Sequence, residues 1–201
     1  DGTTSLVRDL ARDEVRIRLI HRIGRAGLSS AIKEGVINAK GDIVAIMDSD
    51  GQHEPEDVLE AIRKLISNQL DIVIGSRFQK NSDLQGLSKA RQDGSTLANN
   101  IARISLSRKY SNLSDYMSGC IVIRRDSCLA FTQRVDVNGF KFLYELLAIS
   151  NGCLNIQEIP IKFKSRSHGK SKLDISILWD FIISLLHTIS GKILPRRAIS
   201  F

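Results

Sequence analysis

The stretch Ile43-Val44-Ala45-Ile46-Met47-Asp48-Ser49-Asp50-Gly51-Gln52 constrains the fold of this chain more than any other. An unbroken apolar run predicts a buried strand, which ends on two carboxylates separated by one residue. Because strand side chains alternate, Asp48 and Asp50 should point to the same side. Two like charges so close repel each other unless a cation lies between them.

Carboxylate oxygens, with the Gln52 amide nearby, suit a hard divalent ion such as Mg²⁺ or Mn²⁺. Such an ion commonly binds substrate phosphates as well, so the pattern indicates a metal–diphosphate site. The alternative is a solvated loop in which the two acids only form a turn.

The formal net charge of +7 indicates an anionic partner, such as a phosphate-bearing ligand or an acidic membrane surface. Aromatic residues make up only 5% of the chain and do not interleave with a basic run, so a nucleic-acid partner is not expected. A length of 201 residues suits one domain with a full α/β core. Cys120, Cys128 and Cys153 lie among apolar residues, which predicts buried, reduced thiols in a cytosolic compartment.

Apolar runs alternate with amphipathic stretches, a pattern typical of β-α-β units and a mainly parallel sheet flanked by helices. The expected strands are Val15–Ile20, Asp42–Met47, Leu70–Ile74, Cys120–Ile123 and Ile156–Phe163. The expected helices are Ser5–Ala11, Leu28–Ala39, one that begins at Pro55, Lys89–Leu106 and Phe140–Ile149.

The C-terminal stretch differs from the other expected elements, because a wide apolar helical face there follows a basic tract without acids. The apolar face consists of Ile175, Leu178, Trp179, Ile182, Leu185, Leu186 and Ile189. Basic residues beside an amphipathic helix fit an element at a membrane surface. A helix packed on the sheet beside solvated lysines fits equally well.

Arg77 follows a strand end, as the acids do, so it should lie at the same edge of the sheet. Arg91 and Ser95 are four residues apart on an expected helix and therefore share a face. A guanidinium and a hydroxyl together suit a phosphate, although an isolated arginine is more often a surface residue.

Two loops could also approach a ligand. Asp115 and the pair Ser118-Gly119 precede a strand, where small residues allow the backbone to come close. Arg166 and Lys172 belong to a basic, glycine-containing loop that could close over a diphosphate. An ordinary turn and a solvated loop are the alternatives.

Taken in order, these stretches resemble glycosyltransferase family 2. The motifs are Gly27-Leu28-Ser29-Ser30-Ala31, the stretch from Met47 to Glu56, and Gly75-Ser76-Arg77-Phe78. The later Asp115 … Ser118-Gly119 and Arg166 … Gly169-Lys170-Ser171-Lys172-Leu173 narrow the resemblance to the polyprenyl-phosphate (dolichyl-phosphate) mannosyl- or glucosyltransferases.

The resemblance implies a GT-A fold over residues 1–172, with residues 173–201 forming an amphipathic helix at the membrane surface and the start of a membrane-anchoring region. It implies an inverting, metal-dependent transfer of a hexose, from GDP-mannose or UDP-glucose, to a polyprenyl phosphate at the cytoplasmic face of a membrane. The implied cofactor is Mg²⁺ or Mn²⁺.

The resemblance also implies a role for each matching residue. Asp48, Asp50 and Gln52 would hold the metal, and Arg77, Arg91 and Ser95 would bind the acceptor phosphate. The implied catalytic group is Asp50, Asp115 and Arg77. The implied donor site is Asp1, Asp48, Asp50, Gln52, Ser118, Arg166 and Lys172.

The chain departs from the family pattern at its start. Asp1-Gly2-Thr3 aligns best with the end of an acidic motif that follows the family's first strand. Asp1 could instead be the second acid of that motif, although the residues after it fit less well. We therefore expect truncation at the start, an unpaired strand in the sheet, and a segment that need not be active by itself. Pro195–Phe201 resembles the approach to a transmembrane module that follows this domain in some relatives, so we expect truncation at the other end as well.

Two other functions fit parts of the sequence. An apolar strand followed by Asp-x-Asp-Gly also opens the haloacid-dehalogenase-type phosphatases, but those need Thr or Val where Gln52-His53 stands. A non-catalytic module that binds membranes or polyanions would explain the positive charge, and would leave Asp48 and Asp50 without a role.

Overall fold

The computed structural model describes residues 2–24, 27–80, 82, 89–136 and 141–164, with only the backbone of residues 89–94. The helices are α1 (Thr3–Asp13), α2 (Leu28–Asn38), α3 (Pro55–Ser67), α4 (Lys89–Ser105), α5 (Arg125–Arg134) and α6 (Phe142–Ser150), with a short 3₁₀ helix at Arg108–Tyr110. The strands are β1 (Ile43–Met47), β2 (Ile72–Ser76), β3 (Cys120–Arg124) and β4 (Ile156–Pro160).

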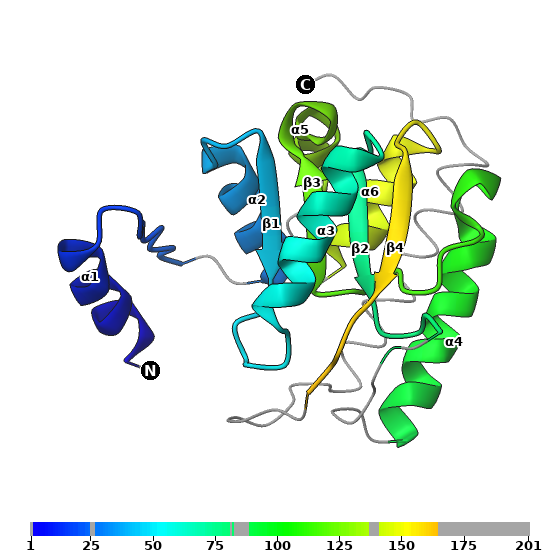
Figure 1. Ribbon diagram of the computed structural model, residues 1–201, viewed down its shortest axis with the longest axis horizontal. Coiled ribbons are helices and arrows are strands. Elements are labelled where there is room, and N and C mark those ends of the chain that lie inside the picture. The colour runs from blue at the N-terminus through cyan, green and yellow to red at the C-terminus, as the bar shows by residue number, and fades with distance from the viewer. Residues whose placement is uncertain (1, 25–26, 81, 83–88, 137–140, 165–201) are drawn as a thin grey trace.

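The four described strands form one sheet in the order β1-β3-β2-β4 (Figure 1). β3 is antiparallel to both β1 and β2, whereas β2 and β4 are parallel, so three of these strands run in one direction and β3 runs against them. Met47 pairs with Cys120, and Ile74 pairs with Ile121. The ends of β1 and β2 therefore lie on either side of the start of β3.

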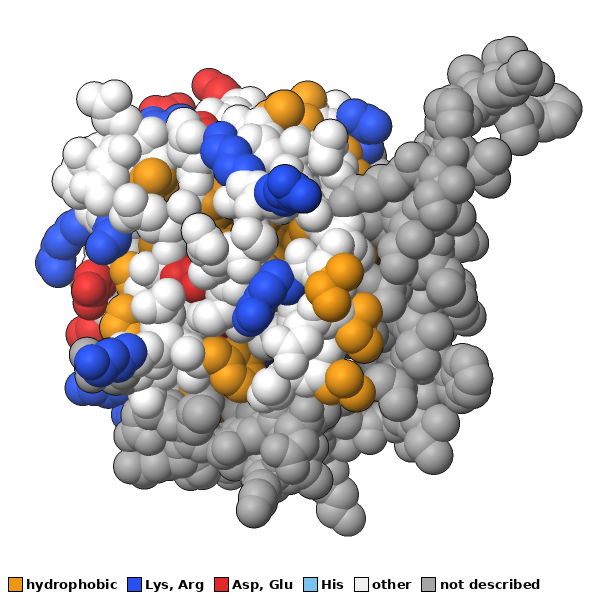
Figure 2. Space-filling view, turned by 90° about the vertical axis from the view of Figure 1, so that its right-hand side faces the viewer, with side chains coloured by type: hydrophobic (Ala, Val, Ile, Leu, Met, Phe, Trp, Pro, Cys, Tyr) orange, Lys and Arg blue, Asp and Glu red, His pale blue; other side chains and the backbone are white. Residues whose placement is uncertain are grey.

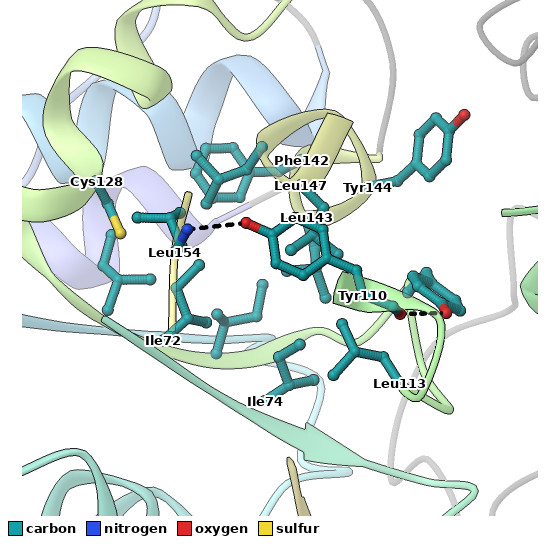
Figure 3. Close-up of a cluster of buried hydrophobic side chains, with 14 of the residues drawn as sticks. Ile72, Ile74, Tyr110, Leu113, Cys128, Phe142, Leu143, Tyr144, Leu147 and Leu154 are labelled. Atoms are coloured by element: carbon teal, nitrogen blue, oxygen red, sulfur yellow. Dashed lines mark hydrogen bonds between the residues drawn. The ribbon is translucent and has the colours of Figure 1, made fainter. Parts of the chain in front are cut away.

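Alternating strand side chains separate two apolar clusters, one on each face of the sheet. Val73 packs with Ala61 and Leu65 of α3 on one face. Ile72 and Ile74 pack on the other, in a cluster that α6 and the 3₁₀ helix also supply (Figure 3). There the Tyr110 hydroxyl accepts a hydrogen bond from the Leu154 amide at 3.0 Å, so this large cluster also buries satisfied polar groups.

Most of the expected elements are present. Pro55 begins α3, whose buried stripe includes Leu65, with Val58 and Ile62 partly buried beside it. Val36 of α2 is fully buried. The expected strands β1, β2, β3 and β4 form within one or two residues of their expected starts. The sheet flanked by helices confirms the predicted α/β class.

Three expectations are wrong. Val15–Ile20 is not a strand: Val15 is 91% exposed, and no described strand pairs with this segment. β1 is half-buried rather than buried, because it pairs only with β3 among the described strands. Cys153 is exposed, unlike Cys120 and Cys128.

The outer face of α4 has exposed hydrophobic side chains, including Leu97 and Ile104. Figure 2 shows this side of the molecule, where hydrophobic and basic side chains lie next to one another. None of the described helices is long and apolar enough to cross a membrane. The amphipathic helix expected within residues 173–201 lies outside the described residues.

Candidate functional site

The loop after β1 places Asp48 against the start of β3. The Asp48 amide donates to the Gly119 carbonyl at 3.2 Å, and the Asp48 carboxylate lies over the Gly119 α-carbon, where an added Cβ would overlap it. Glycine at this position therefore makes room for the carboxylate. Asp50 closes the loop, since its Oδ1 accepts the Gln52 amide at 3.1 Å.

Gln52 is buried and joins this loop to the segment that follows β4. Its side-chain Nε2 donates to the Lys164 carbonyl at 2.9 Å, and the Lys164 amide donates to the Gln52 carbonyl at 3.0 Å. The Lys164 ammonium also forms an ion pair with Glu54. The amide nitrogen of Gln52 is thus engaged within the protein, so a metal could only be bound through the amide oxygen.

Arg77 lies just beyond β2, at the same edge of the sheet as the acids, as expected. Its Nε and Nη2 donate to the two Asp115 oxygens at 2.8 and 2.9 Å, and Nη2 also donates to the Met117 carbonyl at 3.2 Å. Burial disfavours the charged guanidinium, but the carboxylates of Asp115 and Asp48 outweigh that effect and raise the pKa of Arg77. Asp48 and Arg77 therefore belong to one site.

Asp115 is completely buried, and a residue of β4 binds its backbone. The Asp115 and Ser114 amides both donate to the Glu158 carboxylate at 2.9 Å. This support fixes the Asp115 backbone, and the Asp115 carboxylate in turn fixes Arg77. The arrangement suits an orienting role for Asp115 better than a role as a base, because its oxygens are already engaged by Arg77.

Ser118 and Ser95 have different surroundings. The Ser118 hydroxyl is buried and donates to the Gly75 carbonyl at 2.6 Å, so it ties β2 to the start of β3. Ser95 is half-buried on α4. The remaining predicted site residues, namely Asp1, the Arg91 side chain, Arg166 and Lys172, lie outside the described residues.

The structure adds two residues that the sequence analysis did not place in the site, His53 and Phe163. Their rings meet edge to face, with centroids 5.2 Å apart, and the Arg77 guanidinium lies over the Phe163 ring at 5.5 Å. His53 is 7% exposed, and its Nδ1 has no hydrogen-bond partner among the described residues. Burial, and then the charge of Arg77, lower the pKa of His53. The histidine is therefore neutral near pH 7.

The loop after β1 carries Asp48 and Asp50, and we call it the carboxylate loop. The site thus combines the carboxylate loop with the Arg77 guanidinium, which Asp115 fixes, at one edge of a mixed sheet. Residues 1–130 match the family model described as "Glycosyl transferase family 2". The chain belongs to glycosyltransferase family 2.

Relatives of this glycosyltransferase include dolichol-phosphate mannosyltransferases from three organisms. The Pyrococcus furiosus protein is 33% identical over 83% of this chain and 46% of its own length. The Mycosarcoma maydis protein is 31% identical over 92% of this chain and 62% of its own length, and the Saccharomyces cerevisiae protein is 30% identical over 92% and 69%. The chain therefore spans only part of the length of these relatives.

Solved structures of glucosyl-3-phosphoglycerate synthase from Mycobacterium tuberculosis share the fold. The complex with phosphoglyceric acid has a TM-score of 0.63 at 16% identity, covering 94% of this chain and 65% of that one. The complex with Mn²⁺, UDP and glucosyl-3-phosphoglycerate has a TM-score of 0.58 at 17% identity, covering 88% and 59%. This likeness confirms the predicted GT-A fold for this family member. The assignment leaves the phosphatase and the non-catalytic module without support.

The carboxylates of Asp48 and Asp50 are oxygen groups of the kind that a hard divalent ion binds. Gly119 leaves the space that the Asp48 carboxylate occupies. Among the described residues, no three His, Cys, Asp or Glu side chains converge to hold a metal. An ion here would therefore need further oxygen ligands, such as those of a diphosphate.

Proposed function

We propose that this glycosyltransferase transfers a hexose, with mannose as the first candidate, from a nucleotide sugar to a polyprenyl phosphate. One observation supports this most strongly: the Asp48 carboxylate and the Arg77 guanidinium follow the ends of β1 and β2, which run in the same direction on either side of the start of β3. In the candidate site Asp48 would bind a metal-bound diphosphate, and Arg77 would bind a phosphate. The three dolichol-phosphate mannosyltransferases favour mannose as the sugar.

On the donor side, Asp48 and Asp50 would hold Mg²⁺ or Mn²⁺, with the Gln52 amide oxygen as a further ligand. When bound, the ion would neutralise the charge that develops on the leaving diphosphate. Mn²⁺ and Mg²⁺ both occur with UDP in structures of the synthase that shares this fold. Asp1, Ser118, Arg166 and Lys172 complete the proposed donor site.

On the acceptor side, Arg77 would bind the phosphate through Nη1, which has no hydrogen-bond partner among the described residues. Arg91 and Ser95 would complete the phosphate site from α4. A phosphate monoester is already mostly ionised near neutrality, with a second pKa of ~6. Its oxygen can attack the anomeric carbon without a protein base, and such direct attack inverts that carbon.

The acceptor is a lipid, so the acceptor site should lie next to a membrane surface. Leu97 and Ile104 of α4 are 59% and 86% exposed, close in sequence to the proposed phosphate ligand Ser95. We place residues 1–172 in the catalytic domain and residues 173–201 at the cytoplasmic membrane surface. The basic and apolar pattern of that last segment supports this placement.

A transfer assay tests the proposal directly. The chain is incubated with a short polyprenyl phosphate in detergent, Mn²⁺, and either radiolabelled GDP-mannose or radiolabelled UDP-glucose. We expect label in the lipid fraction from GDP-mannose, with an inverted anomeric carbon, and loss of that label on addition of EDTA. Release of free sugar without lipid product, or transfer unaffected by EDTA, would contradict the proposal.

A further inference from the structure

The segment after β4 contacts the rest of the site at every residue from 161 to 164. The Ile161 amide donates to the Ser76 carbonyl at 3.2 Å, and the Lys162 amide donates to Asp57 at 3.1 Å. Phe163 meets His53 and Arg77, and Lys164 meets Gln52 and Glu54. These contacts join β2, α3 and the loop after β1 through one short stretch of backbone.

The consecutive residues 52–54 hold Phe163-Lys164 by three different interactions. Gln52 forms two hydrogen bonds with the Lys164 backbone, His53 packs edge to face on Phe163, and Glu54 pairs with the Lys164 ammonium. We call this set of contacts the clasp. It connects the carboxylate loop to Phe163, although these residues are more than 100 positions apart in the sequence.

Phe163 is unusual among the buried apolar residues. It is only 8% exposed, yet it belongs to neither of the two apolar clusters that flank the sheet. Its ring contacts are instead the imidazole of His53 and the guanidinium of Arg77. An aromatic face beneath a buried guanidinium attracts the cation and restricts its movement.

We propose that Phe163, held by the clasp, is a positioning residue. It keeps the Arg77 guanidinium in a fixed position relative to the carboxylates of Asp48 and Asp50. The proposal rests on the proposed function, in which Arg77 binds the acceptor phosphate. Asp115 binds one edge of the guanidinium, and the rings of Phe163 and of the adjacent residue Phe78 lie 5.5 and 5.6 Å from it. Together they leave Nη1 as the amino group that can meet a ligand.

The first test measures the geometry alone, so it does not require activity. In the full chain, the Nε–H signal of Arg77, assigned with Arg77→Lys, should shift upfield because of the Phe163 ring. The Phe78 ring, 5.6 Å from the guanidinium, contributes to the shift as well, so Phe163→Leu should reduce the shift rather than abolish it. Phe163→Tyr should retain the full shift, while Phe131→Leu, an equal change in α5, should leave it unchanged. An Arg77 signal that is the same in Phe163→Leu and in the wild-type chain would overturn the proposal.

The second test measures steady-state transfer. Phe163→Leu should raise the KM for polyprenyl phosphate roughly fivefold, the loss expected for a partly buried cation–π contact, and leave the KM for the nucleotide sugar unchanged. Phe163→Tyr should restore the acceptor KM. Equal changes in both KM values, or no rescue by tyrosine, would overturn the positioning role. A wild-type chain without transfer would contradict the proposed function, while the Arg77 signal would still decide the role of Phe163.

Discussion

Arg77 and Asp115, 38 residues apart in the chain, form a bidentate ion pair in which the carboxylate is completely buried and the arginine side chain is 13% exposed. The pair crosses from the end of β2 to the loop before β3. Because both Asp115 oxygens are engaged, the pair fixes the plane of the guanidinium as well as its position.

Asp115→Asn should therefore destabilise the protein strongly. The substitution leaves a buried guanidinium without its counter-charge, which typically costs about 3–5 kcal/mol. Urea unfolding should show this loss. As a control, Asp9→Asn removes the partner of Arg12 in an exposed pair and should cost no more than about 0.5 kcal/mol. Losses of similar size in the two variants would contradict the importance of the buried pair.

Gly119→Ala should weaken metal binding, because the new Cβ would overlap the Asp48 carboxylate and displace it. Titration with Mn²⁺, followed by its electron paramagnetic resonance signal, measures the effect. Gly35→Ala is the matched control: it lies in α2 with no atom within 4 Å of the added Cβ, and should stabilise that helix by up to about 1 kcal/mol. Wild-type ion affinity in Gly119→Ala would contradict the placement of the ion beside Asp48.

Glu145 should make stability depend on pH. Burial raises its pKa from 4.5 to about 7, against the hydrogen bond from the Asp136 amide and the charges of Lys141 and Lys33, which lower it. A raised native pKa means that the folded state favours the protonated acid. Its stabilising contribution is complete below pH 4.5 and is lost as the pH rises through 7.

Melting temperatures of the wild-type chain and of Glu145→Gln, measured from pH 5 to pH 8, test this directly. The wild-type chain should lose stability relative to Glu145→Gln as the pH rises. Glu60→Gln, an exposed change on α3, should follow the wild-type chain. A constant difference between wild type and Glu145→Gln across this range would show that Glu145 keeps an ordinary pKa.

Local patterns predicted much of the sheet and of the site. Pro55 with its flanking acids marked the start of α3, and the apolar run before Asp48 marked β1. Strand ends at Asp48 and Arg77 predicted that these side chains share an edge of the sheet. These features depend on residues close together in sequence, or on the general rule that parallel strands end at the same edge.

Other features depend on contacts that no local pattern specifies. The β-branched segment Val15–Ile20 has strand composition, but a strand also needs a partner, and the described sheet provides none there. No feature of the β3 sequence indicates that this strand runs antiparallel to its two neighbours. From the sequence alone, Phe163 looks like a residue of the apolar core. Its contacts with His53 and Arg77 join distant parts of the chain, so no local pattern indicates them. The hydrogen bond from the Ser118 hydroxyl to the Gly75 carbonyl, which ties β2 to the start of β3, is another contact of this kind.

Calorimetric titration of GDP-mannose, with and without Mn²⁺, tests most directly whether Asp48 and Asp50 recruit an ion that binds the donor diphosphate. Asp50→Asn is the informative variant, because it keeps the oxygen that accepts the Gln52 amide and removes the charge. Asp42→Asn, at the other end of β1, is the control. We expect binding heat only with Mn²⁺, in the wild-type chain and Asp42→Asn, and none in Asp50→Asn. Equal affinity for GDP-mannose with and without the ion, or in Asp50→Asn and wild type, would contradict this role.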